Sequence, residues 1–375
     1  MKDIMVENME LNKPLDFDSF ITLIEYTAVK KKAKFWKVIC LTTDFEEFTE
    51  LEKKLSLYGF ELNTWGNILE IKTSIKKEDF KEDNKDQFTG YILKYNDMFL
   101  FFSNENKNDI NTYFITNFVR KAKNIYYMWI PKKIIEKLIE EFEEEYEKFL
   151  VTEFFSERDL LDNTGAHFRE TIERKIKYTG IDGLEVLKEL QYYYGVRPYI
   201  VDFKIIDECS FRINNDGFFT YATGKLRFLI DIIEKIYKKV IIIINLTRSS
   251  HYEEIPKKDL KVKTLDIQPV RIKFKTFELT TDNFNDFAEI LKTNGFELFD
   301  TSIEAGSIQL NTDIIDVNKK AIFNISSGGR ELIITPRFRT TFDTIFRYLE
   351  VMNEYIDSES EYELFKNPRL IYETS

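Results

Sequence analysis

Two stretches of the chain, more than two hundred residues apart, share one pattern for beginning and ending a helix. LTTDFEEFTELEKKLSLYGFEL begins at Leu41, and LTTDNFNDFAEILKTNGFEL begins at Leu279. In each stretch an aspartate, Asp44 or Asp282, stands where it can cap a helix, and a glycine stands where it can end one. Capping explains the aspartate and the glycine, but not the shared LTT and FEL. The pattern therefore predicts a duplicated unit, with coincidence of two capped helices as the alternative.

Glycines mark where each predicted helix stops and the next strand begins. Gly59 and Gly295 occupy this position in the two copies, and Gly195 occupies it after GIDGLEVLKELQYYYGV in the middle of the chain. All three helices are followed by alternating apolar segments that predict strands with a hairpin, and then by a closing helix. The recurring order predicts an α+β fold of two or three related units, each with helices on antiparallel strands.

The unit boundaries follow from charge runs and from one long helix. We expect an N-terminal unit at 1–130, a central unit at 131–248 and a C-terminal unit at 262–375 that resembles the first. The central unit is entered by a long acidic helix in IPKKIIEKLIEEFEEEYEKFL, whose apolar stripe is Ile134, Leu138, Phe142 and Phe149. The charged segment 74–88 predicts a loop inside the first unit, and 249–261 predicts a linker before the third.

Composition narrows the compartment and the partners. The 375 residues include 34 Phe and 20 Tyr but only two cysteines, far apart, so neither a disulfide framework nor a cysteine-based zinc site is expected. The N-terminus is too charged for a secretory signal, and no apolar run is long enough to cross a bilayer. We expect a cytoplasmic protein with no membrane partner. The net charge of −11 means that any anionic partner must meet a local basic patch.

Two predicted strand-to-helix junctions carry paired cations. TGKLR places Lys225 and Arg227 at one junction, and TPRFR places Arg337 and Arg339 at another. Cations are disfavoured at a helix N-terminus unless an anion joins them, so these residues predict an anion site, which Arg330 could complete. Nucleic-acid phosphate is the natural anion for such a site. The alternative is that these cations simply pair with surface carboxylates.

AHFRETIERKIKY, at 166–178, is a further basic segment. Its spacing predicts a helix that carries Arg169 and Arg174, with Phe168, Ile172 and Ile176 as an apolar stripe. His167 is one of only two histidines, and no HxxxH or HxH pair is present, so we expect no metal site and no cofactor.

Catalytic signatures are scarce in the sequence. Glu70 with Lys72, and Asp202 with Lys204, have the acid-x-Lys spacing that puts both charges on one face of a strand and could support a metal-dependent nuclease. Any amphipathic strand in a chain with 32% charged residues will show this spacing. No P-loop, GxGxxG, GxSxG or HExxH motif is present. Enzymatic activity is therefore uncertain, and we assign no catalytic residue.

The interpretation that best fits these observations is a non-catalytic binding or assembly subunit of a larger complex. It would meet an anionic partner, such as nucleic acid, through the basic junctions of its central and C-terminal units, and it would also bind a protein partner. The alternatives are a divalent-metal-dependent nuclease or phosphodiesterase, and a scaffold that binds only protein.

Overall fold

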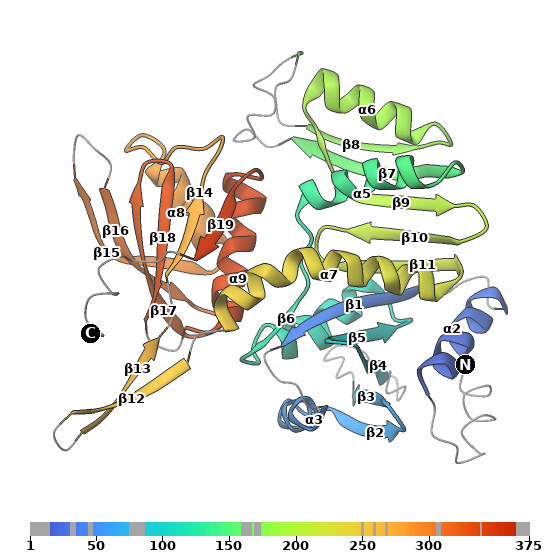
Figure 1. Ribbon diagram of the computed structural model, residues 1–375, viewed down its shortest axis with the longest axis horizontal. Coiled ribbons are helices and arrows are strands. Elements are labelled where there is room, and N and C mark those ends of the chain that lie inside the picture. Colours follow the sequence, from blue (N-terminus) through green and yellow to red (C-terminus); the bar gives the residue numbers. More distant parts are fainter. Residues whose placement is uncertain are drawn as a thin grey trace, which may run out of the picture.

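The structure is a computed structural model in which two β-sheet bodies meet at one helix (Figure 1). It describes residues 16–30, 35–43, 48–74, 87–158, 167–168, 174–248, 251–257, 260–266, 269–304, 309–337 and 340–364. The first body contains an 11-stranded antiparallel sheet and the second a six-stranded antiparallel sheet. Because helices pack on antiparallel sheets in both bodies, the predicted α+β class is confirmed.

The sheet of the first body combines strands from the first and central predicted units. Its order is β2 (Glu61–Trp65), β3 (Ile68–Ser74), β4 (Gln87–Tyr95), β5 (Met98–Ser103), β1 (Trp36–Thr43), β11 (Phe218–Gly224), β10 (Cys209–Asn214), β9 (Arg197–Ile205), β7 (Phe149–Arg158) and β8 (Arg174–Thr179), with β6 (Ile125–Tyr127) also beside β1. The helical elements are α2 (Phe17–Lys30), α3 (Phe48–Leu57), α4 (Lys107–Asp109), the π-helix η1 (Ile110–Val119), α5 (Lys132–Glu145), α6 (Gly183–Tyr194) and α7 (Leu226–Arg248). The two units join where β1 pairs with β11, with Val38 opposite Phe219.

Strand β5 is apolar from Met98 to Phe102 because helices cover both of its faces. Successive side chains of a strand point to opposite faces of the sheet. The ring of Phe101 therefore stacks on Phe114 of η1, with 4.0 Å between ring centroids, while Phe102 meets Phe20 of α2 at 5.5 Å. All six residues of β5 are buried. This sandwich forms the centre of the first core.

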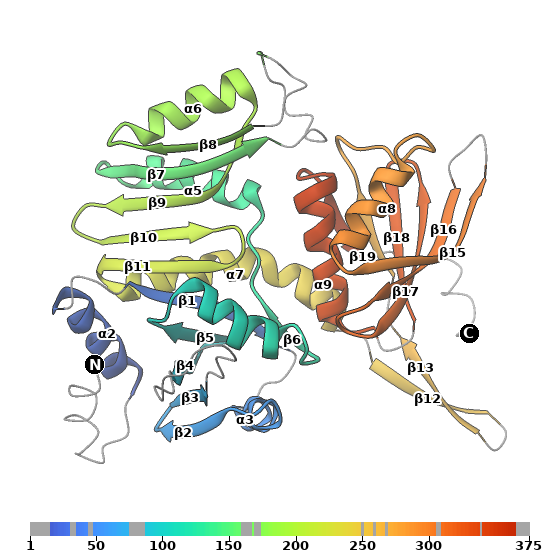
Figure 2. The same ribbon diagram turned by 180° about the vertical axis from the view of Figure 1, so that it is seen from behind.

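In the described part of the chain, helices cover one face of the sheet from β7 to β11. Helix α5 packs on β9 and α7 on β10, and Figure 2 shows both helices behind these strands. On the opposite face, Arg212 forms ion pairs with Asp202 on the neighbouring strand and with Glu153 one strand further away. That face is therefore a solvated surface of mixed charge.

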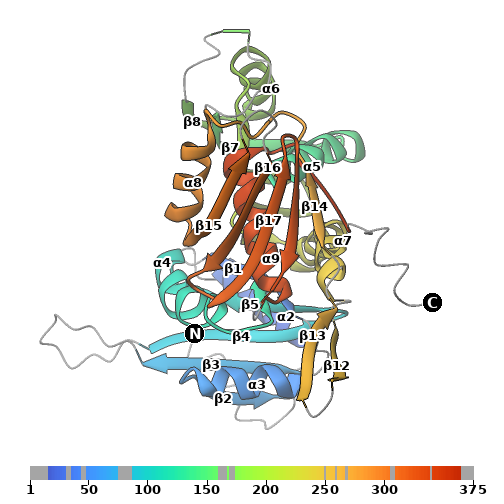
Figure 3. The same cartoon turned by 90° about the vertical axis from the view of Figure 1, so that its left-hand side faces the viewer.

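The second body repeats the strand arrangement of the first predicted unit. Its sheet order is β15 (Phe296–Glu304), β16 (Gln309–Asp316), β17 (Ala321–Gly328), β18 (Glu331–Pro336), β14 (Val270–Lys273) and β19 (Glu361–Leu364). The first five correspond in order to β2, β3, β4, β5 and β1. Its helices are α8 (Phe284–Thr293), α9 (Phe342–Val351) and the π-helix η2 (Met352–Ile356), and α9 lies behind the sheet in Figure 3. Descent from a duplicated unit stays a prediction.

The structure has helix ends at the three predicted glycines, but one predicted N-cap is wrong. Gly59, Gly195 and Gly295 all follow helices with positive φ, at 85°, 62° and 78°. The prediction that Asp282 caps a helix is wrong, because α8 begins at Phe284 and its N-cap is Asn283. Asp44 lies outside the described residues, as do 75–86 of the predicted charged loop.

Three further predictions are corrected. The segment with Arg174, Ile176 and Tyr178 is the strand β8 rather than a helix: these three side chains are half-buried while those between them are exposed, which is the period of a strand. The predicted linker instead contains a hairpin of β12 (His251–Lys257) and β13 (Leu260–Asp266). The long acidic helix is confirmed as α5, but it ends before Phe149, which belongs to β7.

Two glycines with similar backbone angles test the packing of the first body. At Gly217, φ is +78° and an added Cβ would lie 2.0 Å from the backbone oxygen of Met128, whereas at Gly59, φ is +85° and nothing lies within 4 Å. We expect Gly59→Ala to cost about 1 kcal/mol from the left-handed backbone alone, and Gly217→Ala to cost at least about 2 kcal/mol more. Urea unfolding of both variants measures the difference, and equal losses would contradict the close approach.

Candidate functional site

Most of the cations predicted from the sequence are engaged by carboxylates. Ion pairs join Lys225 to Glu208 at 2.9 Å, Arg227 to Asp18 at 2.6 Å, Arg330 to Glu278 at 3.2 Å, and Arg337 to Asp313. The N-terminus of α7, where an anion was predicted, already donates from the amide of Leu226 to the carboxylate of Glu25 at 2.7 Å. Arg339 and Arg169 lie outside the described residues.

The structure does not gather these cations into one site. Lys225 and Arg227 lie at the start of α7 in the first body. Arg330 and Arg337 belong to the second body, at opposite ends of β18. An anion site at these junctions stays a prediction.

Arg174 differs from the other described candidates because it forms no ion pair with a described residue. It begins β8, and its guanidinium lies over the ring of Tyr194 at the end of α6, 4.3 Å from the ring centroid. Its Nε atom is buried without a hydrogen-bond partner. Arg158, opposite Arg174 on β7, donates to the backbone oxygen of Tyr194 at 3.1 Å. The end of α6 is therefore attached to the sheet by two arginines.

Exposed aromatic rings surround this end of α6. His167 lies 4.4 Å from Tyr192, and Phe168 lies 5.7 Å from Tyr193, measured between ring centroids. Phe168, Tyr192 and Tyr193 are 55%, 60% and 42% exposed. We call His167, Phe168, Arg174, Tyr192 and Tyr193 the α6–β8 patch.

The two acid-x-Lys pairs lie far apart in the sheet. Glu70 on β3 is buried and forms an ion pair with Lys72 at 2.7 Å. Asp202 on β9 instead pairs with Arg212 of the neighbouring strand. Six strand spacings separate β3 from β9, or about 29 Å at about 4.8 Å each. Within the described part of the chain, no three or more His, Cys, Asp or Glu side chains are grouped so that they could hold a metal ion.

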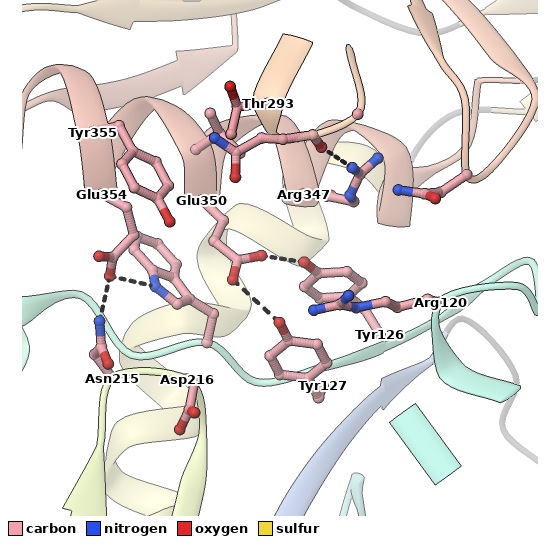
Figure 4. Close-up of a pocket in the computed structure, with 15 residues that line it drawn as sticks. Arg120, Tyr126, Tyr127, Asn215, Asp216, Thr293, Arg347, Glu350, Glu354 and Tyr355 are labelled. Atoms are coloured by element: carbon pink, nitrogen blue, oxygen red, sulfur yellow. Dashed lines mark hydrogen bonds between the residues drawn. The ribbon is translucent and has the colours of Figure 1, made fainter. Parts of the chain in front are cut away.

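A cleft of about 580 Å³ lies where the two bodies meet, and we call it the inter-sheet cleft (Figure 4). One wall comes from the first body, through the segment after η1 and the β10–β11 turn, and includes Tyr126, Tyr127 and Trp129. The other wall is formed by α9 and η2, which present Glu350 and Glu354. Sequence reasoning did not find this site, because its two walls are more than a hundred residues apart in the chain.

Glu350 is a carboxylate held by neutral donors. Tyr126 donates to its Oε2 and Tyr127 to its Oε1, the latter at 3.2 Å. Burial, reinforced by the charge of Glu354, raises the pKa of Glu350 to about 7, although the hydroxyls of both tyrosines and Arg347 act in the opposite direction. Burial raises the pKa of both tyrosines as well, so they remain hydroxyl donors near neutral pH.

Glu354 stands one helical turn further along the same wall. Its Oε1 accepts from the indole of Trp129 at 2.9 Å and from the side-chain amide of Asn215 at 2.8 Å. Lys132 lies 3.7 Å from its other oxygen but is closer to Glu157, at 2.9 Å. Burial again raises the pKa of Glu354. The cleft therefore presents two neighbouring carboxylates that both resist ionisation.

Comparison with known proteins gives two matches. A family model described as "AF_0896_M: family middle domain" matches residues 133–216. A protein of Archaeoglobus fulgidus that carries the description "Uncharacterized protein" is 22% identical over 255 residues, which cover 65% of this chain and 69% of the relative. The matched middle domain runs from α5 to the β10–β11 turn and contains the α6–β8 patch. Across the described residues, no helix is long and apolar enough to cross a membrane.

Glu350 makes the stability of the fold depend on pH. A carboxyl whose pKa is about 7 when folded and 4.5 otherwise binds more protons in the folded state between these values, so the free energy of unfolding falls as pH rises from about 4.5 to 7. We expect Glu350→Gln to remove about 1 to 3 kcal/mol of this fall. Urea unfolding at pH 5 and pH 8 measures it, with the exposed Glu189→Gln as control. Equal pH dependence in wild type and Glu350→Gln would disprove the expectation.

Proposed function

We propose that the chain is a non-catalytic binding or assembly subunit that takes single-stranded nucleic acid on the α6–β8 patch. The proposal rests on the surroundings of Arg174. Among the described candidate cations it alone has no ion pair with a described carboxylate. It lies over the half-buried ring of Tyr194, whose centroid is 6.5 Å from that of the exposed Phe168. Cations beside exposed rings are the combination that binds single strands, because phosphates pair with the charge and bases stack on the rings.

Strand β8 also carries two lysines, whose side chains point to the face of the sheet opposite Arg174. Lys175 and Lys177 on β8 have side chains that are 78% and 56% exposed, and each lies more than 3 Å from its cross-strand glutamate partner. Exposed pairs of this kind are weak, so a phosphate can compete for the lysines. Among the described strands, β8 is the edge of the sheet, so no described strand pairs with its outer backbone groups.

The metal-dependent nuclease gains no support from the acid-x-Lys residues, which lie on strands six positions apart. The protein-only scaffold remains the competing proposal, since Tyr and Arg are also common at protein interfaces. The two are separated by their dependence on salt. Phosphate contacts release counterions, so binding to nucleic acid weakens steeply as the salt concentration rises.

Substitutions in the patch test the proposal through binding to a fluorescent oligonucleotide. For single-stranded DNA or RNA, we expect Arg174→Gln to lower the slope of log affinity against log salt by about 0.7, the value for one lost phosphate contact. Tyr192→Ala should weaken binding by about 1 to 3 kcal/mol, because a base loses its stacking partner. Fluorescence anisotropy over a salt titration measures both effects.

Arg227→Gln is the matched control, since it removes one exposed cation that is paired with Asp18 at the distant start of α7. It should leave binding unchanged. If Arg227→Gln weakens binding and Arg174→Gln does not, the anion site lies at the α7 junction instead. If wild-type protein binds no single strand at low salt, the nucleic-acid proposal fails and the scaffold is favoured.

A further inference from the structure

The inter-sheet cleft combines aromatic walls with carboxylates that lack full charge compensation. Four aromatic side chains, Tyr126, Tyr127, Trp129 and Tyr355, line it together with Glu350 and Glu354. Figure 4 shows Glu350 directed toward the two tyrosines and Tyr355 beside Glu354. Its volume of about 580 Å³ falls within the range of small-molecule sites.

The charges of the lining divide into those already paired and those that are not. Arg347 is held by Asp316 and by the backbone oxygen of Asn294, and Asp216 pairs with Lys107. Glu354 shares Lys132 with Glu157, which lies closer to that lysine. Glu350 has no ion pair with a described residue. Its two hydrogen bonds come from neutral hydroxyls, which do not neutralise a carboxylate in a site that is partly shielded from water.

We propose that the inter-sheet cleft binds a small organic ammonium ion, with Glu350 and Glu354 as counter-ions and the aromatic rings as its walls. An ammonium group is attracted both to carboxylates and to the faces of aromatic rings. A hard metal ion such as Mg²⁺ or Ca²⁺ would need about six oxygen ligands. The carboxylates of the cleft already accept hydrogen bonds from hydroxyl, indole and amide groups, so few of their lone pairs are free for a metal ion. An organic ammonium ion needs fewer contacts and can adapt to those that remain.

The charge of Arg120 distinguishes between two kinds of amine ligand. It lines the cleft, is exposed, and forms no ion pair with a described residue. An amine that also carries a carboxylate would pair with Arg120, whereas a simple diamine would be repelled by it. Charge at this one position therefore separates a zwitterionic ligand from a polyamine.

Calorimetric titration of the full chain at pH 8 tests the site with 1,4-diaminobutane and 4-aminobutyrate, and with 1,4-butanediol as the uncharged control. We expect at least one amine to bind and the diol not to bind. Glu350→Gln should weaken that amine at least tenfold, and Glu189→Gln, at an exposed glutamate on α6, should leave it unchanged. Arg120→Gln should weaken the aminobutyrate only, or strengthen the diamine.

Proton release provides an independent readout. A bound ammonium favours the ionised form of Glu350, so amine binding at pH 6.5 should release protons, measured as a dependence of the binding heat on buffer ionisation enthalpy. Should Glu350→Gln not fold, Tyr355→Leu tests the cleft instead, because Tyr355 is 47% exposed and its loss removes a ring without opening a core. The proposal is overturned if neither amine binds at 10 mM, or if the variant used as the test binds as tightly as wild type.

Discussion

Helix α9 buries apolar side chains on two sides, and this double burial holds the two bodies together. Phe342 and Phe346, one helical turn apart, pack into the core of the first body. Ile345, Tyr348 and Leu349 pack into the core of the second. A helix that is apolar on opposite faces can bury both only between two packed elements, and on the side of the first body α9 contacts α7. The position of α9 thus determines which residues of the two bodies can meet.

Polar side chains of the same helix then determine how the bodies are aligned. Asp343 forms a buried ion pair with Lys319 at 2.8 Å, and Lys319 also donates to backbone oxygens of Val119 and Ala122, where η1 ends. A cation at the end of a helix is favourable because it satisfies free carbonyl groups. Removing one partner of a buried pair is costly, so this contact favours one alignment of α9 over its alternatives. Glu350 follows on the same helix and Glu354 on η2, which directly continues it, and that alignment places both in the inter-sheet cleft.

The two proposed sites depend on different parts of the architecture. The α6–β8 patch belongs to the edge of the first sheet, where strand pairing ends and side chains remain exposed. The inter-sheet cleft exists only because α9 joins the second body to the first. A ligand in the cleft would contact both bodies, whereas a strand on the patch would contact only the described edge elements of the first. The chemistry also differs, since the patch presents cations and the cleft presents carboxylates.

Local signals in the sequence determined much of the secondary structure. Glycine ends helices at Gly59, Gly195 and Gly295 because it adopts positive φ without steric cost, and this holds whatever the helix packs against. Local signals failed where contacts with neighbouring elements determine the secondary structure. The segment 166–178 has helical spacing of charges, yet its part from Arg174 pairs with β7 because the sheet offers backbone hydrogen bonds along its edge. The α+β class could be read from local periodicity, but the joining of two units in one sheet through β1 and β11 could not. Nor could the cleft be predicted from the sequence. The raised pKa of Glu350 and its hydrogen bonds depend on burial that only the packing of α9 creates, and on Tyr126 and Tyr127, more than two hundred residues away.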